Sequence, residues 1–258
     1  MKMGKKDPHR FSDPKITSKV DTEYRIALEE YFPRSIGSYT EKLLNFPKYV
    51  PRPAIMRFLC KYEIFKHILN VHGSIIECGV LFGGGLMTWA QLSTILEPIN
   101  HQRKIIGFDT FSGFTSVVEE DKTARASEHA KAGGLALDSF QDLKDCIQLY
   151  DMNRPLNHIE KVKIVKGDIK ETVPKFIQEN PHTVVSLLYL DVDVFEPTLV
   201  ALEHFMPRIP RGGIIAFDEL NAEGFPGETT AVLQKLGINN LRIQRPTFGT
   251  QISYAVVE

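Results

Sequence analysis

The feature that most constrains this chain is the regular alternation of short apolar runs with segments of helical periodicity. Five apolar runs have the length and composition of strands: SIIECGV (74–80), KIIGFD (104–109), VKIVKGD (162–168), VVSLLYLD (184–191) and GGIIAFDE (212–219). Amphipathic segments such as GLMTWAQLSTIL and TLVALEHFM lie between them. Strands that alternate with helices indicate an α/β fold, and runs as apolar as VVSLLYL indicate a sheet covered on both faces. We therefore predict a doubly wound, mostly parallel sheet.

The last two strand-like runs, LRIQ (241–244) and ISYAVV (252–257), are separated only by RPTFGTQ. A connection of this length is too short for a helical crossover between parallel strands. The sequence therefore predicts an antiparallel hairpin that closes one edge of the sheet.

Residues 1–52 differ from the rest of the chain because they are polar and aromatic, with four prolines before residue 50. We interpret them as an N-terminal helical arm or lid, and residues 53–258 as the main domain. Pro53 suits the first turn of a helix through PAIMRFLCKYEIFKHILNV. Because an irregular arm needs a surface to pack on, we expect a homo-oligomer, a dimer or larger.

The bulk properties narrow the class of protein. The net charge of −1 does not favour a nucleic-acid partner or an anionic membrane surface. No run approaches the roughly 20 apolar residues of a membrane span. The three cysteines, Cys60, Cys78 and Cys146, are too few and too scattered for a disulfide framework or a zinc site. We expect a cytoplasmic protein with reduced thiols and no nucleic-acid or membrane partner.

Acidic residues occupy the ends of the predicted strands. Glu77, Asp109, Asp191 and Asp218 each end a run, and Asp168 lies just past one. Ligands of open parallel sheets bind at the carboxyl ends of the strands, so these side chains are expected to converge on one rim. Each could instead cap the helix that follows, since Asp is a frequent N-cap. Five acids in register favour a binding site over capping.

The first two strands carry the features of a nucleoside site. The turn ECGVLFGGG follows the first strand, with Gly79 suited to a tight turn and Gly83 to a close approach of backbone N–H groups to a ligand. The turn is not G-x-G-x-x-G and holds no Lys or Arg, so a dinucleotide pyrophosphate fits poorly. Asp109 occupies the position at which an acid accepts hydrogen bonds from ribose hydroxyls.

Neighbours of these acids complete the predicted nucleoside site. Thr110 and Phe111 follow Asp109, and the Phe111 ring could lie against adenine or pack in the core. Asp168, followed by Ile169, could accept from the adenine amino group or cap the next helix. These positions suit an adenosine without a phosphate chain.

The fourth and fifth strands carry the features of a metal site. LYLDVDVFEPT places Asp191 and Asp193 two residues apart, so both point the same way while the chain stays extended. GGIIAFDEL adds Asp218 and Glu219. Oxygen donors without Cys or His suit Mg²⁺, Mn²⁺ or Ca²⁺ better than zinc. The alternative is a helix cap at Asp193 and a surface acid at Glu219; we predict Asp191, Asp218 and Glu219 as ligands.

Five motifs occur in the order and spacing of a known family: IIECGVLFGGG, GFDTFSGF, KGDIKETVP, LYLDVDVFEPTLVALEHFMPRIPRGGIIAFDE and GFPGETTAV. Jointly they resemble the macrocin O-methyltransferase family (TylF/MycF type), whose members methylate sugar hydroxyls on macrolides and related glycosylated products. The resemblance covers roughly residues 70–235. It implies that residues 53–258 form a class I methyltransferase domain with a Rossmann-like sheet of seven strands, the number of strand-like runs.

The resemblance also implies the occupants of the two half-sites. S-adenosylmethionine would lie near Glu77, Gly79, Asp109 and Asp168. Magnesium would lie at Asp191, Asp218 and the residue after it.

Two positions depart from the pattern of the family. Glu219 stands where the family usually has a second Asp, and Phe195 stands where it often has Tyr. Residues 1–50 and 115–160 match poorly, so the exact acceptor does not carry over. Within the second of these stretches, residues 115–140 read as a mobile lid over the acceptor site or as a solvated excursion without a role.

Together these features predict an S-adenosylmethionine-dependent, Mg²⁺-assisted O-methyltransferase for a sugar or glycosylated small molecule, in natural-product or polysaccharide biosynthesis. Asp191 is the candidate catalytic residue that receives the proton of the acceptor hydroxyl. Three alternatives stay open. The D-x-D pair of LDVDVF could belong to a metal-dependent glycosyltransferase, the acceptor could be a catechol-type aromatic hydroxyl, or the protein could be a non-catalytic binding protein on the same fold.

Overall fold

The computed structural model describes residues 10–13, 15, 17–249 and 251–258. A six-stranded sheet runs through it in the order β3-β2-β1-β4-β5-β6. The five parallel strands are β1 (Ser74–Cys78), β2 (Ile105–Asp109), β3 (Val162–Lys166), β4 (Val185–Leu190) and β5 (Ile214–Phe217). β6 (Ser253–Val256) is antiparallel to β5. The mostly parallel α/β sheet with an antiparallel C-terminal pair is thus confirmed.

The predicted count of seven strands is wrong, because LRIQ does not form a strand. Gln244 makes an isolated antiparallel bridge to Tyr254, with N–O distances of 2.8 and 2.9 Å. Pro246 follows two residues later and has no N–H to donate, so the ladder cannot continue toward the turn. The hairpin therefore shrinks to a single bridge on the outer edge of β6.

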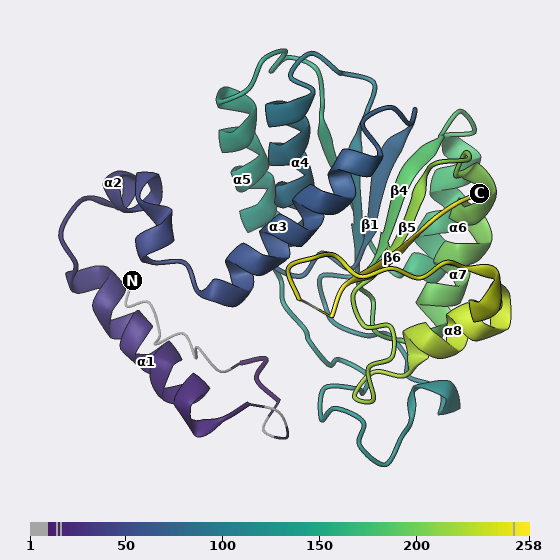
Figure 1. The fold of residues 1–258 in the computed structure, drawn as a ribbon, viewed down its shortest axis with the longest axis horizontal. Coiled ribbons are helices and arrows are strands. Elements are labelled where there is room, and N and C mark those ends of the chain that lie inside the picture. Colours follow the sequence, from purple (N-terminus) through teal and green to yellow (C-terminus); the bar gives the residue numbers. More distant parts are fainter. Residues whose placement is uncertain (1–9, 14, 16, 250) are drawn as a thin grey trace.

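Helices cover both faces of the sheet (Figure 1). One face carries α3 (Arg52–His67), α4 (Gly84–Leu96) and α5 (Phe140–Met152); the other carries α6 (Ile169–Glu179), α7 (Phe195–Phe205) and α8 (Gly227–Lys235). Each face has its own cluster of buried apolar side chains. Burial of each large apolar side chain stabilises the fold by about 1.5–3 kcal/mol. The apolar strand β4 is buried along its whole length and contributes accordingly.

Short 3₁₀ helices complete the elements: η1 (Phe46–Lys48), η2 (Glu119–Asp121), η3 (Met206–Arg208) and η4 (Ile238–Asn240). The strand order reverses between β1 and β4, which is the position where ligands bind in such sheets. Gly79 lies at this point with φ +89°, and a β-carbon there would lie 1.8 Å from the carbonyl oxygen of Asp191. Only glycine permits this approach of the two strand ends.

Two helices precede the sheet domain and lie beside it (Figure 1). α1 (Lys19–Arg34) begins with a capping box between Ser18 and Asp21, and α2 (Tyr39–Leu44) follows it. No residue of α1 is buried. Within the described ranges, none of the helices combines the length and apolarity needed to span a bilayer.

Candidate active site

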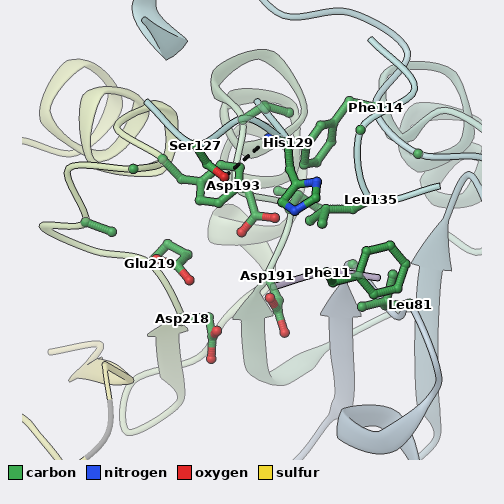
Figure 2. Close-up of a pocket in the computed structure, with 18 of the residues that line it drawn as sticks. Phe11, Leu81, Phe114, Ser127, His129, Leu135, Asp191, Asp193, Asp218 and Glu219 are labelled. Carbon is green, nitrogen blue, oxygen red and sulfur yellow. Dashed lines mark hydrogen bonds between the residues drawn. The ribbon is translucent and has the colours of Figure 1, made fainter. Parts of the chain in front are cut away.

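A cavity of about 1000 Å³ opens at the carboxyl ends of the strands, where the sequence places its acidic residues. This volume is at the upper end of the usual range for small-molecule sites. Gly79, Asp109, Asp191 and Asp218 line it from the ends of β1, β2, β4 and β5. Figure 2 shows Asp191 and Asp218 at the strand ends, with His129 on the opposite side of the cavity.

Asp109 ends β2 and fixes the turn that follows β1. Its Oδ2 accepts hydrogen bonds from the backbone N–H groups of Val80 (2.7 Å) and Leu81 (2.9 Å). Its Oδ1 accepts from the N–H of Phe111 (2.6 Å). Charge-assisted bonds of this kind are strong, so three backbone donors hold the carboxylate at the edge of the cavity.

Asp168 caps a helix and also lines the cavity. It is the N-cap of α6, where its Oδ1 accepts from the N–H of Lys170 (2.9 Å), and it also lines the cavity. Its Oδ2 accepts from the hydroxyl of Thr115 (2.7 Å). The predicted neighbours Thr110 and Ile169 line the cavity as well.

Three of the predicted cofactor residues, Glu77, Gly83 and Phe111, lie behind the cavity wall and do not line it. Phe111 packs in the core, with 5.1 Å between its ring centroid and that of Phe140. Gly83 caps α4 with φ +87°, and a β-carbon there would lie 2.4 Å from Cδ1 of Leu143. These two positions therefore shape the wall from behind.

Glu77 points away from the cavity into a buried polar contact. It is 1% exposed, its Oε2 lies 3.3 Å from Lys61 Nζ, and it accepts from Trp89 Nε1 (2.5 Å). Burial raises the pKa of Glu77, and Lys61 acts in the opposite direction. A β-carbon at Gly85 would lie 2.3 Å from Glu77 Oε1, so glycine at this position leaves room for the carboxylate.

Asp191, Asp193, Asp218 and Glu219 all line the cavity; Figure 2 shows Asp191, Asp218 and Glu219 toward the strand ends and Asp193 nearer to His129. The chain does not stay extended after β4, because Asp193 has φ +64° and the N–H of Val194 donates to the carbonyl of Val192 (2.6 Å). The expectation of an extended backbone through the D-x-D pair is therefore wrong. Both side chains nevertheless reach the cavity.

Burial and mutual repulsion raise the pKa values of these acids. Burial raises the pKa of Asp191 well above its usual range, and Asp218 and Asp193 raise it further. Burial also raises the pKa of Asp193, with Glu219 and Asp218 adding to the effect. The pKa of Glu219 rises to about 7 through burial and the neighbouring Asp218. Without a cation, the cluster therefore retains protons near neutral pH.

Three residues of the acidic side were missed at the sequence level: Arg57, Lys61 and Tyr189. The nearby carboxylates of Asp218 and Asp191 raise the pKa of Arg57, which lines the cavity. The Tyr189 hydroxyl donates to Asp218 Oδ1 (2.5 Å), and Lys61 Nζ lies 3.4 Å from the centroid of the Tyr189 ring. A signal existed, since Arg57 and Lys61 are four residues apart and so share one face of a helix that packs on the sheet.

The acidic side fits a divalent cation in its donor chemistry. In the part of the chain that the structure describes, no three Asp, Glu, His or Cys side chains form a ready-made ligand group. The donors are carboxylate oxygens, however, which are the ligands that Mg²⁺ and Mn²⁺ prefer. Among the described residues, the buried Oε2 of Glu228 has no hydrogen-bond partner. Oxygen donors and unmet buried negative charge both suit a cation of charge 2+.

The segment 115–140 contributes residues to the cavity lining and is tied to other parts of the chain. Asp121 Oδ1 accepts from the N–H of Phe195 (2.6 Å) at the start of α7. The N–H of Ser127 donates to the carbonyl of Gly224 (2.9 Å). Both contacts join the segment to elements that follow the acidic strand ends.

Comparison with known proteins points to one family. The sequence profile of the family described as macrocin O-methyltransferase (TylF) matches residues 61–235. CalS11, described as a calicheamicin methyltransferase and as a TDP-rhamnose 3'-O-methyltransferase, has two similar solved structures. One is 33% identical with a TM-score of 0.87 and covers 93% of each chain. The other, without ligands, is 32% identical with a TM-score of 0.80 and covers 93% of this chain and 95% of CalS11.

Two curated relatives from Streptomyces are also similar. The 8-demethyl-8-(2,3-dimethoxy-α-L-rhamnosyl)-tetracenomycin-C 4'-O-methyltransferase of Streptomyces olivaceus is 26% identical over 154 residues, which are 58% of this chain and 54% of the relative. The demethyldecarbamoylnovobiocin O-methyltransferase of Streptomyces niveus is 24% identical over 152 residues, 58% of this chain and 53% of the relative. The matches thus span about half the length of these curated relatives.

Proposed function

The chain belongs to the macrocin O-methyltransferase (TylF) family, and from this premise we propose that it transfers the methyl group of S-adenosylmethionine to a hydroxyl of a sugar or glycosylated small molecule. The observation that carries the proposal is the arrangement of the cavity. One side offers carboxylates held by backbone N–H groups, and the other offers a cluster of buried acids. The first side suits the uncharged nucleoside part of the methyl donor. The second side suits an acceptor hydroxyl that is bound to a cation.

S-adenosylmethionine is assigned to the side of the cavity formed by β1, β2 and β3. Gly79, Asp109, Thr110, Asp168 and Ile169 line the cavity and would contact the cofactor. Asp109 would accept from the ribose hydroxyls and Asp168 from the adenine amino group. The other three predicted residues act from behind the wall, by fixing the turn and the start of α4.

Magnesium is assigned to Asp191, Asp218 and Glu219. A bound divalent cation lowers the pKa of a coordinated hydroxyl and fixes its position. Asp218 is already oriented by the Tyr189 hydroxyl, and Arg57 offsets part of the charge of the cluster. These residues would hold Mn²⁺ or Ca²⁺ as well, because the donor type is the same.

Asp191 is the proposed catalytic residue. It takes the proton of the acceptor hydroxyl while the oxygen forms its bond to the methyl carbon and the bond from that carbon to sulfur breaks. The sulfonium is already activated, so the remaining residues of the cavity mainly align the acceptor.

The glycosyltransferase alternative is not favoured. The match of residues 61–235 to the macrocin O-methyltransferase family supports methyl transfer instead. Catechol-type acceptors are also less well supported, because CalS11 is described as acting on TDP-rhamnose and the Streptomyces olivaceus relative on a rhamnosylated product. We therefore propose nucleotide-activated and glycosidically bound deoxysugars as the first acceptors to test.

Segment 115–140 and the described part of the arm of residues 1–52 are proposed to act as lids over the acceptor side of the cavity. Segment 115–140 contributes Ser127, His129 and Leu135 to the cavity lining. The ordering of a lid by ligand protects it from limited proteolysis, so cleavage at Arg125 or Lys131 should slow when S-adenosylhomocysteine and Mg²⁺ are present. Equal cleavage with and without ligand would count against the lid.

We also propose that the protein forms a homo-oligomer, because α1 buries none of its residues and so has a surface free to pack on a second copy.

The deciding experiment is calorimetric titration with S-adenosylhomocysteine in the presence of Mg²⁺. One-to-one binding at micromolar concentration or tighter is expected. Methyl transfer to TDP-rhamnose and to a rhamnosyl glycoside is then compared. Absence of any S-adenosylhomocysteine binding would overturn the methyltransferase proposal.

A further inference from the structure

Glu228 is a buried acid that neither half-site includes. It lies in GFPGETTAV, in the first turn of α8, and it is 0% exposed. Its Oε1 accepts a hydrogen bond from the backbone N–H of Glu219 (3.1 Å). Its Oε2 is buried and, among the residues that the structure describes, has no hydrogen-bond partner. A fully buried carboxylate with one unused oxygen is costly unless something compensates its charge.

The surroundings of Glu228 supply more negative charge and little positive charge. The charged groups that act on it are Asp218, Asp193, Asp191 and Glu219. In the described part of the chain, it forms no ion pair with Lys, Arg or His within 4.0 Å. The N-terminus of α8 favours a negative charge, but the effect of one helix end is small. The helix alone therefore does not offset four neighbouring acids.

The hydrogen bond from Glu219 to the buried Glu228 fixes the backbone at the end of β5. Asp218 and Glu219 lie at the end of β5, where the strand has ended and its hydrogen bonds no longer fix the chain. The Tyr189 hydroxyl holds the side chain of Asp218, and Glu228 holds the backbone of Glu219. Both anchors are fully or almost fully buried, so the two strand-end acids are oriented from behind the cavity wall.

We propose that Glu228 is a positioning residue of the cation site, which fixes Glu219 through its backbone N–H and raises the affinity for a divalent cation through its own negative charge. This inference rests on the proposed Mg²⁺ site. Partners that orient metal ligands in this way typically change metal affinity by about 10- to 100-fold when they are replaced. Glu228 is not required to contact either the methyl donor or the acceptor.

Glu228→Gln separates this role from simple packing, because Gln has nearly the same shape and keeps an oxygen for the N–H of Glu219. Mn²⁺ is titrated calorimetrically into the full chain, with and without saturating S-adenosylhomocysteine. We expect Mn²⁺ affinity to fall by about tenfold or more, and S-adenosylhomocysteine affinity to change less than about twofold. With Mn²⁺, the gain in melting temperature should be smaller for the variant than for the unsubstituted protein.

Glu203→Gln is the matched control, since it removes one charge from a side chain that is 57% exposed and pairs with Lys235 on α8. It should leave Mn²⁺ affinity unchanged. If Glu228→Gln does not fold, Glu228→Met, which is neutral and of similar size, replaces it. Unchanged Mn²⁺ affinity in the Glu228 variant, with binding by the unsubstituted protein, overturns this inference alone. No Mn²⁺ binding by the unsubstituted protein overturns the metal site and this inference with it.

Discussion

The two sides of the cavity use the same side-chain chemistry in opposite ways. On the side of β2 and β3, Asp109 accepts from three backbone N–H groups and Asp168 from one backbone N–H and one hydroxyl. On the side of β4 and β5, no hydrogen bond from a described residue reaches the side chains of Asp191, Asp193 or Glu219. On the first side, groups of the protein itself donate hydrogen bonds to the carboxylates. On the second side, three of the acids receive no hydrogen bond from described residues.

This contrast indicates how each side gains its ligand. A carboxylate already held by backbone donors is rigid and offers its remaining lone pairs to neutral hydroxyl or amino groups. Acids that repel one another in a buried place gain most from a cation, which replaces the protons that they would otherwise hold. We therefore expect the two sides to respond independently to substitution.

The largest expected effect is at Asp191. Asp191→Asn keeps the shape but removes the charge and the basic oxygen, so methyl transfer should fall by about 10²- to 10⁴-fold. S-adenosylhomocysteine affinity should stay within about twofold, because Asp109 and Asp168 are untouched. Turnover assays and calorimetry on the same preparation measure both quantities. Normal turnover in this variant would remove Asp191 from the mechanism.

Substitution of Asp109 is expected to weaken S-adenosylhomocysteine binding and to leave metal binding intact. Asp109→Ala removes the acceptor for three backbone N–H groups and, in the proposed complex, for the ribose hydroxyls. Since hydrogen bonds to a charged group contribute about 1.5–3 kcal/mol, S-adenosylhomocysteine affinity should fall by about 10- to 100-fold. Mn²⁺ affinity should hardly change.

Loss of both affinities in the Asp109 variant would contradict the independence of the two sides. A circular dichroism spectrum and a melting curve serve as controls for folding. Asp109→Asn is the milder companion variant, because it keeps one oxygen for the backbone donors.

A pH experiment tests the same contrast without substitution. Acids such as Glu219, whose pKa is raised to about 7 in the folded state, bind more protons folded than unfolded. Their contribution to the free energy of unfolding is therefore present below about pH 4.5 and is lost as pH rises toward and through 7. In EDTA, the melting temperature should fall by about 3–8 °C between pH 5.5 and pH 8.

Added Mg²⁺ should raise the melting temperature more at pH 8 than at pH 5.5, because protons and the cation compete for the same oxygens. Glu219→Gln should flatten the decline in EDTA. A decline that is equal in EDTA and in Mg²⁺ would show that it originates elsewhere in the molecule.

Much of this arrangement could be predicted from the sequence, because topology alone brings the strand-end acids together. Five apolar runs gave five parallel strands, and Asp109, Asp168, Asp191 and Asp218 line one cavity. The direction of an individual side chain depends on one or two dihedral angles and on partners distant in sequence. Glu77 therefore turns toward Lys61, which no strand-end pattern indicates.

The predictions that were wrong or missing concern features that depend on backbone conformation and tertiary packing. The seventh strand is absent because residues 241–243 do not pair with β6 and only Gln244 does, while Pro246 stops the ladder from extending toward the turn. The left-handed conformation of Asp193 changes the geometry of the D-x-D pair without a glycine to signal it. Tyr189 and Glu228 look like ordinary strand and helix residues in the sequence, and only tertiary packing places them against Asp218 and Glu219.

The smallest expected effect is at Glu219, where the family usually has Asp. Glu219→Asp shortens the side chain by one methylene but keeps the charge, the fold and the backbone contact to Glu228. Mg²⁺ demands near-ideal octahedral geometry, whereas Ca²⁺ tolerates irregular ligands, so a change in arm length should alter their ranking more than the overall affinity. We expect a shift of about two- to fivefold in the ratio of Mg²⁺ to Ca²⁺ affinity, with S-adenosylhomocysteine binding unchanged. An unchanged ratio would indicate that Glu219 does not touch the ion, and that the acidic side is completed by Asp191 and Asp218 with another oxygen donor.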